Sequence, residues 1–310
     1  MNDFFPKDIN IKKAVLATLA YFDIFGILLT EEEVLDNLLF IEPDAPKVAI
    51  YLKESPLIKE FGGYYSISKT QDFAKEYKIF LEKKTRAHIY WKKIRRTQWL
   101  LNACPFVNLI AVCNSLPIGD VNPDSDIDLF VIAKPNRMFT ARLFLTIFTS
   151  VFGLRRYGTK IHKRFCLSFY ITENNLDLSQ IAQKPYDIYL AYWLKTMEPL
   201  CGDYKVYQKL LQENFTWLKD FFYAVPELKR HYRKKNSLIK KFLEWLFDSD
   251  EIESKQKNYQ LKRAQEKYEL LKDKSGTIIS DTILKFHDKD ARTTVRNHWV
   301  HLLKDLLRAF

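Results

Sequence analysis

The chain has 310 residues, of which 47% are hydrophobic and 28% charged, with only 8 Gly and 11 Pro. These values exclude a disordered, collagen-like or linker-dominated protein and suit two or three folded domains. The 4 cysteines are far apart and form no CxxC pair, which argues against a disulfide framework or zinc ribbon. No apolar run approaches the roughly 20 residues of a membrane span, so we expect a cytoplasmic protein with no membrane partner.

The net charge of +11 is unevenly distributed along the chain. Residues 1–70 carry 7 basic and 11 acidic side chains, whereas residues 71–100 carry 9 basic and 3 acidic ones. Residues 201–310 carry 23 basic and 16 acidic side chains. A basic surface favours phosphate-bearing partners, but charge alone does not separate nucleotides from nucleic acids.

The N-terminal region predicts three helices followed by a hairpin. Residues 11–25 predict the first helix, which Gly26 ends. Thr30, followed by three glutamates, caps the second helix, and Asp44 caps the third. A glycine pair at positions 62–63 lies between aromatic and β-branched residues and predicts a hairpin turn.

This order of elements resembles a winged helix-turn-helix module, and we assign residues 1–69 to a winged-helix-like domain. Duplex DNA is bound largely by neutralising its phosphates, so the acidic balance of the module argues against DNA binding. A winged-helix DNA-binding regulator is kept as an alternative. Residues 70–102 predict one long helix rich in Lys and Arg, which is either a phosphate- or RNA-facing surface or a solvated connector with a buried stripe.

Two apolar strands and the polar turn between them carry the chemistry. The first strand covers residues 106–112, and the turn presents the Ser115 hydroxyl and backbone N–H groups, which suit a phosphate. The second strand begins with Asp126 and Asp128, whose side chains share a face because strand residues alternate. Two such carboxylates require a compensating cation, for which we expect Mg²⁺ (or Mn²⁺). A turn that binds phosphate, beside two carboxylates that bind a metal ion, predicts phosphoryl or nucleotidyl transfer.

This segment resembles the active-site signature of the polymerase-beta-like nucleotidyltransferase superfamily: Gly-Ser, a spacer, then Asp-hydrophobic-Asp-hydrophobic. The resemblance implies that Ser115 contacts phosphate and that Asp126 and Asp128 bind metal. More loosely, the whole chain resembles bacterial proteins with a winged-helix-like head, this catalytic core and a helical tail. The chain departs from the signature at Asn114, where the family has its first glycine; Asn tolerates a left-handed backbone better than most residues.

The family often places a third carboxylate on a later strand, as a base or metal ligand. The later strand here, residues 164–171, contains no acid, and Glu173 just beyond it is the candidate, with an ordinary loop acid as the alternative. The basic loop before this strand is either a site for a triphosphate or a nucleic-acid acceptor, or a solvated loop. The predicted phosphate-binding set is Asn114, Ser115, Gly119, Arg155, Arg156 and Lys160.

The remaining residues are divided between a core and a tail. Residues 103–185 form the predicted core, and residues 186–310 have helical periodicity and form the predicted C-terminal domain. Within the tail, residues 229–235 are interpreted as a solvated face or hinge. Four tail residues could ligate a metal, but no HExxH motif is present and we interpret them as surface or interface residues. They are His287, Asp288, His298 and His301.

The predicted fold class is therefore an α/β (α+β) nucleotidyltransferase core with a mixed sheet, flanked by a winged-helix-like domain and a helical domain. We expect a Mg²⁺-dependent enzyme that moves a nucleoside monophosphate from NTP to an unidentified acceptor, which is a small molecule, an RNA or a protein. Asp126 and Asp128 hold the metal and Glu173 assists as base. The departure at Asn114 and the absent strand acid motivate an alternative, a catalytically degenerate nucleotide-binding regulator.

Overall fold

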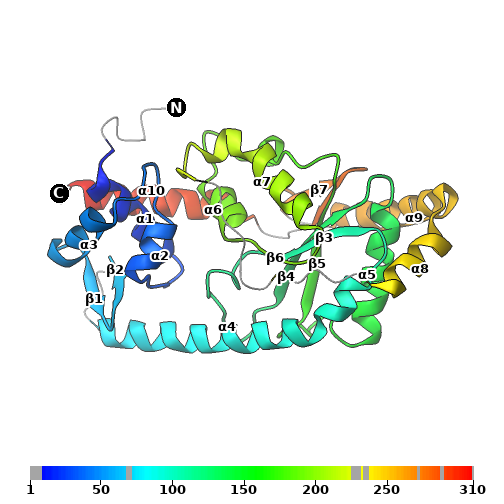
Figure 1. Ribbon diagram of the computed structural model, residues 1–310, viewed down its shortest axis with the longest axis horizontal. Helices are drawn as coiled ribbons and strands as arrows, with labels where there is room; N and C mark the ends of the chain where they lie inside the picture. The colour runs from blue at the N-terminus through cyan, green and yellow to red at the C-terminus, as the bar shows by residue number, and fades with distance from the viewer. Residues whose placement is uncertain are drawn as a thin grey trace.

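A six-stranded sheet lies at the centre of the molecule, and helices cover both of its faces (Figure 1). The computed structural model describes residues 9–67, 72–224, 232, 237–270, 273–286 and 290–308. The predicted mixed α/β architecture is confirmed. The predicted helix start at Thr70, the pair His287 and Asp288, and all of residues 229–235 except Tyr232 lie outside the described residues.

The N-terminal unit has three helices and a hairpin in the predicted order. Thr30 and Glu33 form a capping box that fixes the start of the second helix, and Asn10 and Asp44 cap the first and third helices through their side chains. The five elements are α1 (Ile11–Asp23), α2 (Glu31–Asp36), α3 (Ala45–Glu54), β1 (Lys59–Phe61) and β2 (Tyr64–Ser66).

The strands of the central sheet come from distant parts of the chain and have the order β6-β3-β4-β5-β8-β7. The pair β4 and β5 is parallel, and every other neighbouring pair in this sheet is antiparallel. The expectation of a purely helical tail is wrong, because three of these strands lie within residues 186–310. The strands are β3 (Val107–Val112), β4 (Ile127–Ala133), β5 (Phe165–Thr172), β6 (Glu198–Gly202), β7 (Thr277–Ile279) and β8 (Ile283–Phe286).

Alternating strand residues supply two separate cores. In β4, Leu129 and Val131 pack with the helices α4 and α5, whereas Phe130 and Ile132 pack on the opposite face with α6 and α7. A short 3₁₀ helix, η1 (Ser179–Ile181), precedes α6. The bounds of the four covering helices are α4 (Phe73–Asn102), α5 (Met138–Val151), α6 (Ile188–Thr196) and α7 (Tyr204–Leu218).

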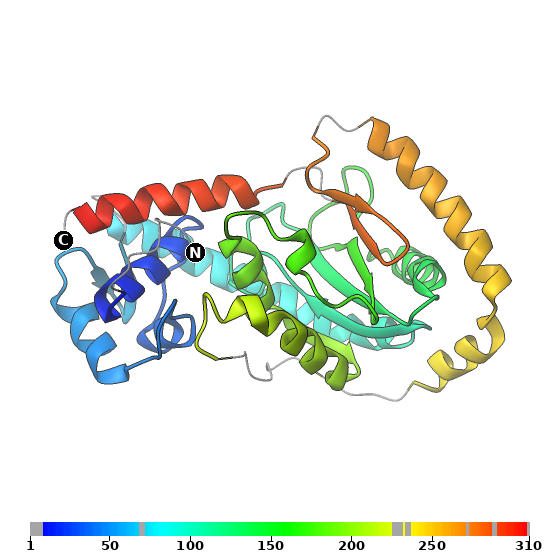
Figure 2. The ribbon, with the colours of Figure 1, turned by 90° about the horizontal axis from the view of Figure 1, so that it is seen from above.

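The last three helices lie in two separate places. Helices α8 (Leu238–Phe247) and α9 (Asp250–Glu269) pass around the edge of the sheet beside α5 (Figure 2). Helix α10 (Arg292–Arg308) returns to the N-terminal unit and packs against α1 and α6. Its Trp299 is fully buried, and the indole N–H donates to the carbonyl oxygen of Ala17 at 2.9 Å. The C-terminal helix is thus part of the N-terminal core.

Helix α4 runs from the N-terminal unit to the sheet (Figure 1). Two of its basic side chains bond to the polar loop between β3 and β4. Lys83 Nζ lies 2.6 Å from the carbonyl oxygen of Phe25 and 2.7 Å from Asp120 Oδ1. Arg86 Nε donates to the carbonyl oxygen of Val121 at 2.8 Å. These cations therefore fix the loop to α4. Within the described residues, no helix combines the length and the apolar composition that a bilayer crossing requires.

Candidate functional site

The turn after β3 has the backbone geometry that the sequence predicts. Asn114 adopts a φ of 62°, in the left-handed region that Asn tolerates at low cost. Gly119 closes the turn with a φ of 81°, its N–H donating to Leu116 O at 3.1 Å, and the Asp120 N–H donates to Ser115 O at 2.9 Å. Asn114 thus adopts the left-handed conformation that this turn requires.

The two predicted aspartates converge at the start of β4. The backbone N–H of Cys113 donates to the carbonyl oxygen of Asp128 at 3.1 Å, which aligns the end of β3 with the start of β4. A carboxylate oxygen of Asp126, one of Asp128 and the Cys166 sulfur all lie within 4.8 Å of one another. The prediction that the two carboxylates share a face is confirmed, and they share it with a thiol.

Sequence reasoning missed Cys166. Its position follows from the parallel pairing of β4 with β5, in which Asp128 lies opposite Cys166. The prediction considered only an acid as the third ligand on this strand, and residues 164–171 contain no acid. A signal was present, since Cys166 is the one cysteine or acid in the predicted strand of residues 164–171, and thiolates also ligate metals.

The structure does not bring Glu173 to the aspartates, so the predicted role of this residue as base needs correction. Glu173 follows the far end of β5, where it accepts a hydrogen bond from the Asn108 side chain and donates its N–H to Ala133 O at 3.0 Å. Glu173 is seven steps along the extended chain from Cys166, which corresponds to about 23 Å at 3.3 Å per residue. Because β4 and β5 are parallel, the ends that meet the aspartates are their first residues.

One residue of the predicted basic loop reaches the site. Arg156 Nη1 lies 2.8 Å from Asp126 Oδ2 and 3.9 Å from the Cys166 sulfur. The backbone N–H of Arg155 donates to Thr149 O of α5, and that of Lys160 donates to Tyr157 O within the loop. The guanidinium of Arg156 therefore supplies part of the positive charge that the carboxylate pair requires.

The surroundings of Asp128 disfavour the charged form of its carboxyl. Burial, and then the neighbouring Asp126 carboxylate, raise the pKa of Asp128 from 3.8 to about 6. Hydrogen bonds from Asn114 and Cys166 and the positive charge of Arg156 lower this pKa, but by less. Burial and the same two carboxylates also raise the pKa of the Cys166 thiol. Two carboxylates with a cysteine sulfur beside them are a donor set that fits a divalent cation.

A cavity of about 220 Å³ opens beside Asp128. Asn114 and Ser115 line it from the turn, Tyr21 lines it from α1, and Trp193 lines it from α6. The N-terminal unit therefore forms one wall of the cavity. Polar groups from the turn thus meet aromatic rings from α1 and α6 in this cavity, a mixed lining that is typical of small-molecule sites.

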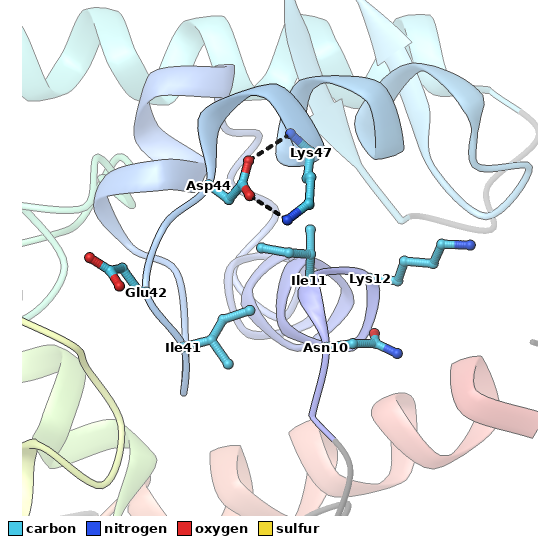
Figure 3. A pocket seen from close by; sticks show the side chains of 7 residues that line it. All are labelled: Asn10, Ile11, Lys12, Ile41, Glu42, Asp44 and Lys47. Carbon is cyan, nitrogen blue, oxygen red and sulfur yellow. Dashed lines mark hydrogen bonds and ion pairs between the residues drawn. The ribbon is translucent and has the colours of Figure 1, made fainter.

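A second hollow, of about 580 Å³, lies on the N-terminal unit between the first turns of α1 and α3 (Figure 3). Its Asp44 and Lys47 pair with each other at 2.7 Å. Glu42 and Lys12 lie on opposite sides of Ile11 and do not point toward a common centre (Figure 3). Because its polar groups do not converge, this hollow offers no arrangement for catalysis or ligand binding. The cavity at Asp128 is the better candidate.

The two tail histidines within the described residues are exposed on α10, as expected of surface residues. His301 lies 3.4 Å from Asp305, one turn further along the same helix. Because these partners belong to a single exposed helix face, they form an ordinary surface pair.

The raised pKa of Asp128 predicts a pH dependence of stability. Between its ordinary value of 3.8 and about 6, the folded protein binds more protons than the unfolded chain, so the free energy of unfolding falls as the pH rises through this window. Asp128→Asn should remove the slope and, at pH 8 in EDTA, stabilise the fold by on the order of 1–3 kcal/mol. Urea titrations of both proteins from pH 4 to 8 measure this, and parallel pH profiles would contradict it.

Comparison of the chain with protein-family models, with curated proteins and with solved structures returns no match.

Proposed function

We propose that this chain is a metal-dependent nucleotidyltransferase, which moves a nucleoside monophosphate from NTP to an acceptor hydroxyl or phosphate and releases pyrophosphate. The observation that carries the proposal is the convergence of Asp126 and Asp128 beside a cavity that the Asn114–Ser115 turn also lines. The resemblance of this segment to the polymerase-beta-like signature supports the same assignment. The acceptor is a small molecule, an RNA or a protein.

The proposal extends to the architecture. We assign the sheet and its turn to a polymerase-beta-like core, to which strand β6 adds an edge from outside residues 103–185. We assign the N-terminal unit to the winged-helix class, on the order of its helices and hairpin. Duplex DNA remains a poor partner for this unit, because Lys47 of α3 is paired with Asp44.

The four cysteines are free, which supports a cytoplasmic location.

In this mechanism Asp126 and Asp128 would hold Mg²⁺ or Mn²⁺. When bound, the ion would supply positive charge against the phosphates and Lewis-acid activation of the attacking oxygen. The Ser115 hydroxyl donates to a phosphate oxygen, and the Asn114 side chain, which bonds to Asp128, holds that carboxylate toward the cavity. Arg156 lies where it can turn from Asp126 to a phosphate, since its guanidinium suits both kinds of oxyanion.

The aromatic side chains that line the cavity form the proposed binding surface for the nucleoside. Tyr21, Tyr189 and Trp193 line the cavity beyond the polar turn. Rings of this kind bind any base by stacking, because every base has a π face. We therefore expect modest discrimination among the four NTPs and a loss of affinity for all of them when the wall is removed.

The test is transfer of label from the α-phosphate of each NTP, in the presence of Mg²⁺, to a component of a cell lysate. The expected result is label in acceptor and release of pyrophosphate, both abolished by EDTA. A degenerate regulator is the second candidate, and the ion pair of Arg156 with Asp126 favours it because it already occupies one carboxylate. Saturable NTP binding without consumption of NTP would identify the regulator and overturn the enzyme.

A further inference from the structure

Cys166 differs from the other three cysteines of the chain in its surroundings. Cys104, Cys113 and Cys201 are buried in the two cores, whereas Cys166 is only partly buried and belongs to the carboxylate cluster. Its sulfur lies within 4.8 Å of a carboxylate oxygen of Asp126 and of Asp128. Strand pairing, with Asp128 opposite Cys166, holds it there.

The identity of this third donor determines which ions the site retains. Mg²⁺ accepts oxygen ligands almost exclusively, whereas Zn²⁺ and Co²⁺ also accept thiolate sulfur. We propose that Asp126, Asp128 and Cys166 together bind a thiophilic divalent cation of the Zn²⁺ class, with Cys166 as the thiolate ligand. The inference rests on the proposed function only in that both use the same aspartates.

Binding is a ligand exchange without a redox change. The Cys166 thiol loses its proton to solvent, a metal–sulfur bond forms, and the ion gives up bound water. Arg156 contacts both Asp126 and Cys166, so the ion and the guanidinium compete for these two side chains. An ion of this class therefore competes with Mg²⁺ for the aspartates and with Arg156 for the sulfur.

The experiment titrates Co²⁺ into the full chain, stripped with EDTA and without nucleotide, and follows the near-ultraviolet band of thiolate-to-cobalt charge transfer. We expect the band in the wild type and in the control Cys201→Ser, and its loss in Cys166→Ser. Zn²⁺ affinity in Cys166→Ser should fall by about 100-fold, since even outer partners of a ligand are worth 10- to 100-fold. Mg²⁺ affinity should stay within about twofold, and Cys166→Asp should raise it by about tenfold, because carboxylate oxygen is the ligand that Mg²⁺ prefers.

A Co²⁺ complex without the band, or with a band that Cys166→Ser retains, would overturn the inference. Its failure is distinguishable from failure of the proposed function. A protein that transfers nucleotides with Mg²⁺ but shows no thiolate band refutes the third ligand alone. A protein that shows the band but consumes no NTP refutes the transferase alone.

A different observation, the orientation of α8, carries a second inference. The side of this helix that contacts the protein is polar. Lys240 Nζ donates to the carbonyl oxygen of Val107, and Glu244 accepts from the backbone N–H of Phe106 at 2.8 Å. Only Phe247, at the last turn, packs on a ring of the core.

The side of α8 that faces solvent is apolar. Surface helices of globular proteins bury their apolar side, and a contiguous exposed apolar patch marks a binding surface. Trp245 is 76% exposed and Leu238 is 80% exposed. The positions repeat at helical spacing, so they form one stripe. Its members are Leu238, Ile239, Phe242, Trp245 and Leu246.

The charge around this stripe selects its partner. The sequence directly before α8, residues 229–235, contains five Lys or Arg, and Lys241 is exposed on the helix. The acids that follow the helix, Asp248 and Asp250, are paired with Arg137 at 2.6 and 2.7 Å. An apolar stripe with aromatic residues, in a helix that follows a basic segment in the sequence, is the pattern of an interfacial helix. We infer that α8 lies on an anionic lipid bilayer, contrary to the expectation of no membrane partner.

The experiment is co-sedimentation of the full chain with phosphatidylcholine vesicles, with or without about one third phosphatidylserine. We expect binding to the anionic vesicles only, weakened by salt. The variant Phe242→Ser with Trp245→Ser should bind about 100-fold less well, the loss expected for two large apolar side chains. The control Trp99→Ser removes a tryptophan that is 52% exposed on α4 and should bind as the wild type does.

Two results would overturn this inference. Equal sedimentation of the wild type and the double variant would show that charge alone recruits the protein. Concentration-dependent dimers in light scattering, lost in the double variant and accompanied by no vesicle binding, would assign the stripe to a second copy of the chain.

Discussion

Replacing Asp126 and Asp128 together with Asn should reduce transfer of label from NTP by at least about 10³-fold, the scale of losing the groups that stabilise transition-state charge. Asn keeps the shape of each side chain but removes the negative charge that holds a divalent cation. Because burial and the charge of Asp126 already raise the pKa of Asp128, the substitution relieves an electrostatic cost, and the variant should fold.

The matched control is Glu173→Gln, which changes an acid at the far end of β5. It should leave transfer within about twofold, since its described partner is Asn108 rather than the site. Each protein is assayed with Mg²⁺ and NTP for pyrophosphate release, and its fold is checked by circular dichroism. Activity of the Asp variant within tenfold of the wild type would contradict the assignment of the metal ligands, as would loss of activity in Glu173→Gln alone.

Trp299→Ala should have the largest effect on stability, about 3–5 kcal/mol in the free energy of unfolding. Trp299 is 0% exposed, and its indole N–H is bonded to Ala17 O. Removing the side chain leaves a cavity between α10 and α1 and removes the indole hydrogen bond to Ala17 O. Urea unfolding monitored by circular dichroism measures the loss.

Trp99→Ala is the control for this second prediction, because its ring is half-exposed and lies near Phe152 on the protein surface. It should cost less than about 1 kcal/mol. A similar loss in both variants, or a Trp299→Ala protein as stable as the wild type, would show that α10 contributes little to the N-terminal core. The Trp299 variant should also bind NTP more weakly, since α1 carries Tyr21 of the cavity wall.

Local chemistry made much of the fold predictable. Helix starts at Thr30 and Asp44 follow from side chains that cap nearby N–H groups, and the structure has both caps. The shared face of Asp126 and Asp128 follows from the alternation of a strand, which needs no knowledge of the partner strand. The left-handed conformation of Asn114 follows in the same way from the tolerance of that residue type.

Features that depend on distant pairing were not predictable in this way. The position of Cys166 depends on the register of β5 against β4, and the distance of Glu173 from the site depends on the direction of that pairing. Strand β6 contains Pro199 and Gly202, which weaken any strand pattern, and only its pairing with β3 makes it a strand. Apolar periodicity identifies α10 as a helix, but it does not say which core the buried face joins.

The double contact of Lys83 has a thermodynamic consequence. One ammonium group holds both the carbonyl oxygen of Phe25, at the end of α1, and the carboxylate of Asp120, in the loop that borders the cavity. A displacement of the N-terminal unit must therefore strain or break a bond to that loop. A ligand that shifts this unit therefore changes the affinity of the cavity for its own ligand. By reciprocity, a ligand bound in the cavity changes the affinity of the N-terminal unit for the first ligand by the same factor.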